Sequence, residues 1–244
     1  MRCDMGFMLE SKKVKRTGFV PVFVAGGIIS ALIPVLNMAV RHKIYTNTNA
    51  SPVNILFDAN WSIMAMLNVL LIVMCACIIY NSEYTDNAIQ KMRMLPVHES
   101  NMYFGKLALI ILMCIAVFII ESCGIVFCID YWFTGSTGTW HLLFKSFVYE
   151  MVLIIPAVLF SLFIASAFKN MWITLGTGVV CVFMATMLPT DNFVLSLFPF
   201  AMPFQIFTNT APDTINRFII AAVIESAVII VMELLLIKIR RISE

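Results

Sequence analysis

The chain carries one long polar segment, NSEYTDNAIQKMRMLPVHESNMYFGK at residues 81–106, between two long apolar runs. Residues 88–95 suit a short helix, and Pro96 ends it because proline cannot continue a helical hydrogen-bond ladder. Three apolar side chains recur about one helical turn apart: Ile89, Met92 and Leu95. The pattern predicts an amphipathic helix that lies on a membrane surface and offers a docking site to another protein.

The composition excludes an ordinary soluble protein. Hydrophobic residues make up 61% of the 244 residues and charged residues 12%, with a mean hydropathy of +0.95. Soluble domains carry about 25% charged residues. The length allows about six spans of ~20 residues and no sizeable soluble domain. We therefore expect an all-α membrane protein with six transmembrane helices in a single domain over residues 1–244.

Six apolar runs account for these spans: residues 17–40, 61–80, 103–129, 143–168, 171–188 and 217–237. The first run is too long for the apolar core of a signal peptide, so it predicts a retained helix. Gly26, Gly27 and Pro34 within it predict a kink or a close contact with another helix.

The segments that connect the runs have distinct expected roles. Residues 41–60 are polar and predict an exposed loop. Trp61 and Tyr80, at the two ends of the second run, are expected in the headgroup layers, where amphipathic rings are favoured. Residues 189–216 are apolar but are broken by four prolines. The two apolar pieces, residues 194–198 and 200–207, are each too short to span a membrane. They predict a re-entrant hairpin at the outer membrane face; an ordinary exposed loop is the alternative.

The basic residues predict the orientation. Twelve of the 16 Lys and Arg residues lie in the N-terminal segment 1–16, in residues 81–106, in the turn at Lys169 or in the C-terminal tail. The positive-inside rule therefore places both termini and the polar segment in the cytoplasm.

Several kinds of chemistry are missing from the sequence. No Gly-x-x-x-x-Gly-Lys-Ser/Thr pattern occurs, so this chain has no P-loop for ATP. The three histidines all lie at segment ends, which supports neither a Ser-His catalytic site nor a metal site. Six of the seven cysteines lie within or at the ends of apolar runs, and we interpret them as apolar filler. The sequence thus predicts a non-enzymatic protein with no metal, no cofactor and no nucleic-acid partner.

Acidic residues inside the apolar runs are more informative, because a carboxylate in hydrocarbon usually faces a bundle interior or water. Counting along the runs puts Glu121, Glu150 and Glu225 in the outer half of the membrane and Glu233 near the inner face. Three acids at similar depth predict a vestibule that attracts a cationic ligand from outside. The alternative is that each acid is protonated or hydrogen-bonded between helices.

Several segments resemble the permease subunits of ABC-2 type transporters, in particular the lantibiotic-immunity subunits of the LanE/LanG and MutE/EpiE-like kind. The likeness starts at residues 9–17, LESKKVKRT, where Glu10, Lys13, Lys15, Arg16 and Thr17 match the family's interfacial segment. It continues with matching positions further along: Trp61, Glu83, Leu95-Pro96-Val97 and Lys106. His98 departs from the family pattern, in which Ser and Arg are common after the Pro-Val pair.

The resemblance implies that residues 81–102 form a cytoplasmic loop with a coupling helix, which contacts a separate ATPase. The coupling residues that it implies are Glu83, Ala88, Ile89, Met92, Leu95, Pro96 and Val97. It also implies two copies of that ATPase, which bind ATP and Mg²⁺, and a second similar permease subunit. The assembly would expel cationic antimicrobial peptides from a bacterial cell membrane. A different exported substrate, or a non-transporting sensor or scaffold, remains an alternative.

Overall fold

The computed structural model describes residues 18–46, 50–84, 99–133, 139–168, 170–189, 192–208 and 210–243. Within these ranges the chain forms seven α-helices and one 3₁₀ turn, η2 (Met202–Phe204). The helices are α2 (Phe19–Tyr45), α3 (Pro52–Tyr84), α5 (Glu99–Trp132), α6 (Thr139–Ala167), α7 (Met171–Met187), α8 (Phe193–Ser196) and α9 (Pro212–Ser243). The expected all-α class is confirmed for the described part of the chain.

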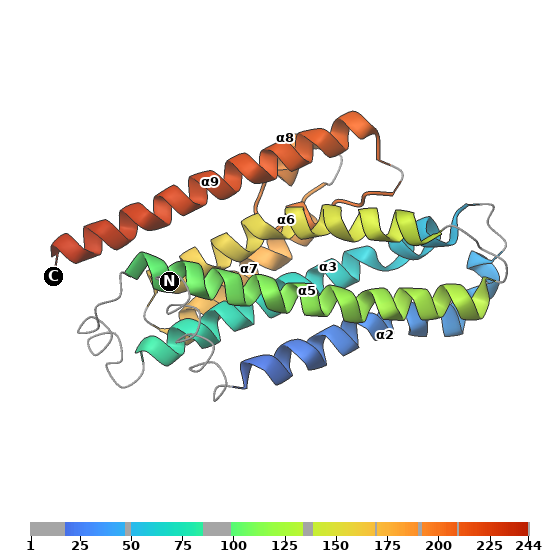
Figure 1. The fold of residues 1–244 in the computed structure, drawn as a ribbon, viewed down its shortest axis with the longest axis horizontal. Helices are drawn as coiled ribbons and strands as arrows, with labels where there is room; N and C mark the ends of the chain where they lie inside the picture. Colours follow the sequence, from blue (N-terminus) through green and yellow to red (C-terminus); the bar gives the residue numbers. More distant parts are fainter. Residues whose placement is uncertain are drawn as a thin grey trace.

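The long helices run alternately up and down an elongated bundle (Figure 1). We call the end at which α3 stops at Tyr84 and α5 starts at Glu99 the base, and the opposite end the far end. The first turn of α2 and the last turn of α9 both point toward the base (Figure 1). Residues 85–98, with the predicted coupling helix, lie outside the described residues.

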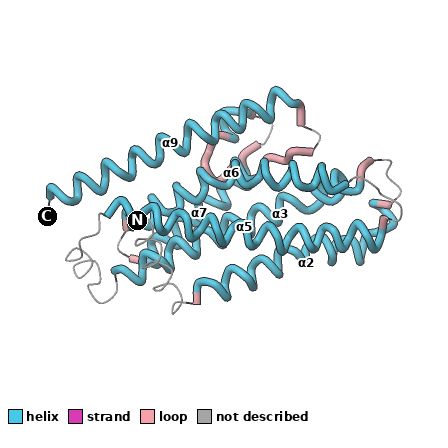
Figure 2. The backbone as a smooth tube through the Cα atoms, in the orientation of Figure 1, coloured by secondary structure: helices cyan, strands magenta, loops and turns pink. Residues whose placement is uncertain are grey.

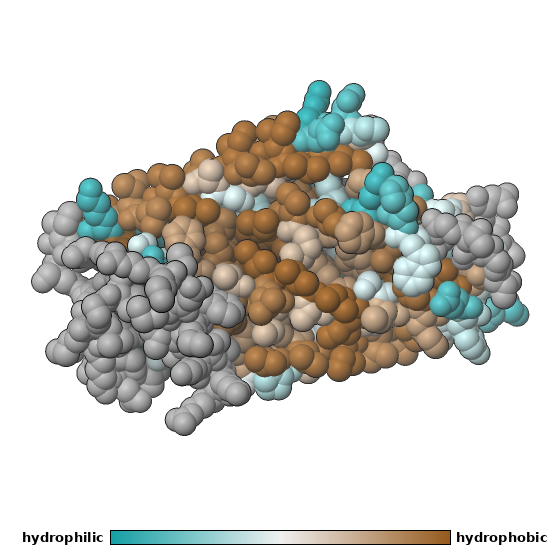
Figure 3. Space-filling view, viewed as in Figure 1, coloured by the Kyte–Doolittle hydropathy of each residue, from teal (hydrophilic) through white to brown (hydrophobic). Residues whose placement is uncertain are grey.

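In the part of the chain that the structure describes, five helices are long and apolar enough to cross a membrane: α2, α3, α5, α6 and α9. α7 is apolar but has only 17 residues, or about 25 Å of helix at ~1.5 Å per residue. On the face drawn in Figure 3, apolar side chains form a band across the middle, and most of the hydrophilic side chains lie toward the far end. This distribution is typical of a multi-pass membrane protein.

The core of the bundle is built on α3 and α6. In their most apolar windows 61% and 67% of the residues are buried, against 17% for α9. α3 packs against α2, α5, α6 and α7, whereas α9 packs mainly against α6 and lies at the edge of the tube drawing (Figure 2). Much of α9 is therefore left to face lipid or another protein.

Glycines allow α2 to approach its neighbours closely, as the sequence predicts. A Cβ atom on Gly26 would lie 2.4 Å from the side chain of Leu71 on α3. At the opposing surface a Cβ on Gly124 of α5 would lie 2.7 Å from the backbone oxygen of Ala31. Small residues of this kind permit tight helix contacts in lipid. The irregular backbone of α2 lies at Arg41 (φ −123°, ψ 19°), not at Pro34.

The predicted loop over residues 41–60 is wrong for most of its length. α2 continues through Arg41 to Tyr45, and α3 begins at Pro52, because proline is well suited to the first position of a helix. Leu56 and Phe57 are buried in the core. Polar residues lie between the buried apolar residues of this segment. The sequence therefore does not show a continuous apolar run that would predict a helix.

Trp61 and Tyr80, which are expected in the headgroup layers, are packed against neighbouring helices. Because α3 begins nine residues earlier and ends four residues later, both rings lie well inside the helix, only 1% and 8% exposed. The indole Nε1 of Trp61 donates to the backbone oxygen of Pro203 at 2.9 Å. Trp61 thus acts as a core residue that anchors η2.

The broken stretch between α7 and α9 forms two short helical segments, α8 and η2, neither of which spans. Asn192 caps α8 by accepting a hydrogen bond from the Val194 amide. Residues 200–204 are buried, and η2 packs against α3 and α6. α9 begins at Pro212, five residues before the predicted start of the last span.

Candidate functional site

A buried ion pair joins the two helices that flank residues 85–98. The Nζ atom of Lys106, near the start of α5, lies 2.5 Å from a carboxylate oxygen of Glu83, near the end of α3. Both side chains are more than nine-tenths buried. The same Nζ lies 4.1 Å from the ring centroid of Tyr80, within cation–π distance. Opposite charges taken out of water require such pairing, since a lone buried charge is strongly unfavourable.

A second set of contacts extends from α3 to α6 and α9. The hydroxyl of Tyr84, the last residue of α3, donates to the backbone oxygen of Ser166 at 2.9 Å. Ser166 Oγ lies 3.0 Å from a carboxylate oxygen of Glu233, to which it can donate. Glu233 is 1% exposed although it lies on the least buried long helix.

Together these side chains form what we call the base network: Tyr80, Glu83, Tyr84, Lys106, Ser166 and Glu233. It includes residues of four helices, α3, α5, α6 and α9, next to the two ends of residues 85–98. The two sets of contacts meet on α3, where the rings of Tyr80 and Tyr84 stack with their centroids 6.3 Å apart.

A model for the family described as "ABC-2 family transporter protein" matches residues 7–185. The chain belongs to the ABC-2 transporter family. It is the membrane permease of an ABC-2 type transporter, a domain without an ATPase site that generally pairs with an ABC ATPase. No curated protein sequence and no solved structure matches the chain.

The permease's predicted coupling residues divide into two groups. Glu83 lies in the described part and belongs to the base network. The others lie outside the described residues: Ala88, Ile89, Met92, Leu95, Pro96 and Val97. The same is true of the interfacial segment 1–16.

Sequence reasoning missed the pairing of Lys106 and the role of Glu233. Lys106 is expected as a cytoplasmic basic residue and as a position that matches the family pattern, yet it is buried among helices. The signal that was present is an acid and a base, each within a few residues of the end of an apolar run, on either side of one loop. Charges at such positions either reach water or pair with each other, and only the packing decides which.

Among the predicted vestibule acids, Glu121 joins three helices. Its carboxylate accepts a hydrogen bond from Ser30 Oγ on α2 and another, at 3.3 Å, from Asn68 Nδ2 on α3. Glu121 is fully buried. In this conformation it stabilises helix contacts inside the bundle.

Glu150 and Glu225 have different surroundings. Glu150 on α6 is 1% exposed, within electrostatic range of Glu121, and neither of its carboxylate oxygens has a hydrogen-bond partner within the described ranges. Glu225 on α9 is partly exposed and lines a cavity of about 660 Å³ together with Arg217 and mostly apolar side chains. The structure therefore brings Glu121 and Glu150 into one region of the core and leaves Glu225 outside it.

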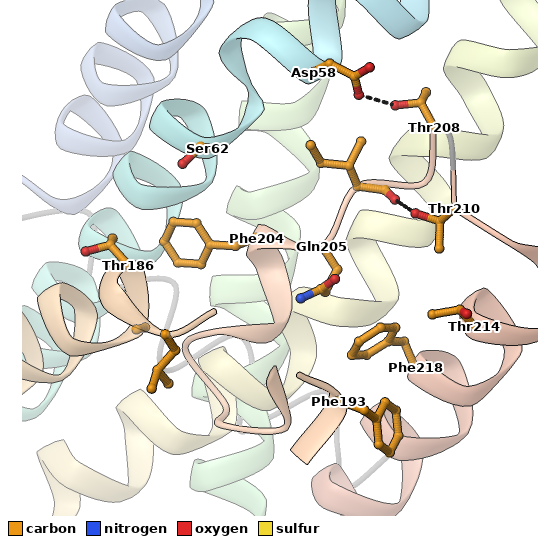
Figure 4. Close-up of a pocket in the computed structure, with 13 residues that line it drawn as sticks. Asp58, Ser62, Thr186, Phe193, Phe204, Gln205, Thr208, Thr210, Thr214 and Phe218 are labelled. Atoms are coloured by element: carbon orange, nitrogen blue, oxygen red, sulfur yellow. Dashed lines mark hydrogen bonds between the residues drawn. The ribbon is translucent and has the colours of Figure 1, made fainter. Parts of the chain in front are cut away.

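A second cavity, of about 590 Å³, lies among the far-end segments α3, α7, α8, η2 and α9 (Figure 4). The carboxylate of Asp58 faces it and accepts a hydrogen bond from Thr208 Oγ1 at 3.1 Å. Asp58 was expected only as part of an exposed loop, so this cavity is a feature that sequence reasoning did not find.

Proposed function

We propose that this permease belongs to an ATP-driven exporter that expels cationic antimicrobial peptides, including lantibiotics, from a bacterial cell membrane. ATP and Mg²⁺ bind to two copies of a separate ATPase, and a second similar permease completes the transporter. Both termini and the base face the cytoplasm. Export of a different substrate by the same machinery is the main alternative.

The observation that carries this proposal is the buried ion pair between Glu83 and Lys106. An ATPase that pushes on residues 83–97 moves the ends of α3 and α5 together, since these ends are joined at the base. Tyr84 and Ser166 extend the connection toward α6 and α9. The rest of the bundle can then follow as a unit, as in other transitions between two packed states.

The acidic residues support a cationic substrate. Glu225 lines a cavity that is open in this conformation. Glu121 and Glu150 are buried, so we propose that they meet substrate only after the helices rearrange during transport. The basic-residue asymmetry predicts that the far end faces the outside of the cell, so a cationic ligand from that side would meet the far end first.

Co-purification tests the docking site. The tagged permease is expressed with the ATPase and the second permease encoded next to it, and the ATPase retained on the affinity resin is quantified. Deleting residues 86–95 should release the ATPase, whereas Asp130→Asn, an exposed acid at the far end of α5, should not. An intact complex after the deletion contradicts docking at this loop.

A susceptibility assay tests the substrate class. Cells with and without the complete transporter are exposed to a panel of cationic peptides and to uncharged antibiotics of similar size. Several-fold protection restricted to the cationic peptides is the expected result. Unchanged susceptibility to every peptide, with a complex that still hydrolyses ATP, indicates another substrate. A purified protein that recruits no ATPase favours a sensor or scaffold.

A further inference from the structure

The far-end cavity has the composition of a binding site for an amphipathic cation. Its volume of about 590 Å³ lies within the range of small-ligand pockets, roughly 300–1,000 Å³. Among the described residues that line it, Asp58 is the only one with a charge. Most of the other polar side chains there carry hydroxyl groups: Ser62, Thr186, Thr208, Thr210 and Thr214. The described residues that line the cavity therefore favour a positively charged group over a negatively charged one.

Asp58 is held in position by its surroundings. Thr208 Oγ1 donates to its Oδ1 atom at 3.1 Å, across 150 residues of sequence. Thr208 follows η2, and η2 is itself tied to α3 by the bond between Trp61 Nε1 and the Pro203 oxygen. A carboxylate fixed in this way needs little reorganisation when a cation arrives.

Gln205 supplies a donor to the same space. Its Nε2 atom is buried and has no hydrogen-bond partner in the described part of the chain. In Figure 4 the amide lies between the rings of Phe204 and Phe218. A buried donor without a partner is unfavourable by about 1–3 kcal/mol until an acceptor arrives, so a bound ligand that carries a carbonyl group satisfies it.

Aromatic rings complete the wall. Phe193 and Phe218 lie with their centroids 5.3 Å apart, and Phe204 faces the cavity from η2 (Figure 4). Ring faces attract cations and also accept apolar groups. The cavity of about 660 Å³ along α9 also includes Phe193 among its lining residues. It offers mostly apolar side chains to the remainder of an amphipathic ligand.

We propose that the far-end cavity binds a side-chain ammonium group of a cationic amphipathic peptide at Asp58, with a neighbouring peptide carbonyl accepting from Gln205. This inference rests on the proposed function and deepens it, because it assigns a substrate contact to Asp58. Asp58 is not one of the predicted vestibule acids Glu121, Glu150 and Glu225. The requirement for a cation, a carbonyl and apolar surface in one ligand favours a peptide over a simple ammonium ion.

Peptide binding to the full-length protein tests the assignment. The protein, with the subunits that co-purify, is placed in phosphatidylcholine nanodiscs without ATP and titrated with a fluorescent peptide of leucine and lysine. Empty nanodiscs give the background. Asp58 is exposed, so Asp58→Asn should weaken binding about threefold to fivefold, the upper part of the range for one exposed charge pair. The lysine-acetylated peptide should bind the wild-type protein as weakly as the original peptide binds the variant.

Matched variants separate binding from folding. Asp58→Glu should recover binding to within about twofold, and Thr208→Val, which keeps the carboxylate, should lose far less than Asp58→Asn. Asp130→Asn changes an exposed acid that does not line the cavity and should bind as the wild type does. Thermal unfolding of each variant is measured in the same nanodiscs.

Three results overturn the assignment. The first is wild-type peptide affinity in a normally folded Asp58→Asn protein. The second is equal binding of the acetylated peptide. The third is displacement of the peptide by phosphatidylethanolamine in the nanodisc, which assigns the cavity to a lipid headgroup. None of these results decides whether the transporter exports cationic peptides. That question is tested separately by the susceptibility assay, which measures whether the transporter protects cells against the peptides.

Discussion

Lys106 Nζ lies 2.5 Å from a Glu83 carboxylate oxygen, with both side chains more than nine-tenths buried and 23 residues apart in sequence. The pair closes the base of the loop between α3 and α5. Because the pair is out of water, each charge stabilises the other, and removing only one leaves the other uncompensated.

Lys106→Met should therefore destabilise the permease by about 3–5 kcal/mol, the usual effect of breaking a buried pair. The double variant Glu83→Gln/Lys106→Met should recover much of that loss, because neither charge remains. Thermal unfolding in detergent measures both. Lys145→Met, at an exposed position on α6, is the control. Equal losses for the single and double variants would show that the two residues do not act as a pair.

Ser166→Ala should weaken the link between α6 and α9. Interhelical hydrogen bonds in membrane proteins contribute about 0.6 kcal/mol on average, so the expected loss of stability is small. A larger effect is expected on transport, since this bond joins Glu233 to the base network. Ser226→Ala removes only a hydroxyl bond within α9, to the Ala222 oxygen, and is the matched control. Equal transport by the two variants would exclude a role for the Ser166–Glu233 contact in coupling.

Gly124→Ala should separate α2 from α5, because the added Cβ would lie 2.7 Å from the Ala31 backbone oxygen. Overpacking of this kind costs about 1–3 kcal/mol. Gly176→Ala is the opposite case: nothing lies within 4 Å of the new atom, and the loss of glycine flexibility should stabilise α7 by about 0.5–1 kcal/mol. An unfolding temperature of Gly124→Ala that equals or exceeds that of the wild type would contradict the close contact.

Trp61→Phe should loosen the stretch between α7 and α9. The change removes the indole donor to the Pro203 oxygen but keeps an aromatic ring stacked near Phe57. We expect a loss of about 1 kcal/mol and faster proteolysis of residues 188–211, measured by limited digestion in detergent. Trp172→Phe, at an exposed position in the first turn of α7, should leave the digestion rate unchanged.

The intramembrane acids give a separate test of the vestibule. Glu225→Gln should lower protection against cationic peptides several-fold while the ATPase still co-purifies, because Glu225 is the predicted acid that lines an open cavity. Glu121→Gln and Glu150→Gln test the two acids that are buried in the bundle core, in the same assay. Asp213→Asn, an exposed acid in the first turn of α9, is the control. Unchanged protection with normal expression of all three Gln variants would remove these acids from the substrate path.

The helix ends show where sequence reasoning stopped being sufficient. The apolar runs at residues 61–80 and 103–129 were found correctly, because composition alone marks a span. α3 nevertheless extends from Pro52 to Tyr84, since residues that look like a polar loop bury one face against neighbouring helices. The burial of Trp61 against Pro203 and Phe57 likewise depends on packing that the sequence does not show.

The sequence by itself determined the class of protein, the approximate spans and the polar segment between the second and third of them. These depend only on how apolar each run is. Only the tertiary structure decided that Glu83 pairs with Lys106, that Trp61 holds Pro203, and that Asp58 and Thr208 meet across 150 residues at one cavity. The physical reason is that these helices are apolar on nearly every side, so their sequences carry no amphipathic pattern to indicate which faces meet.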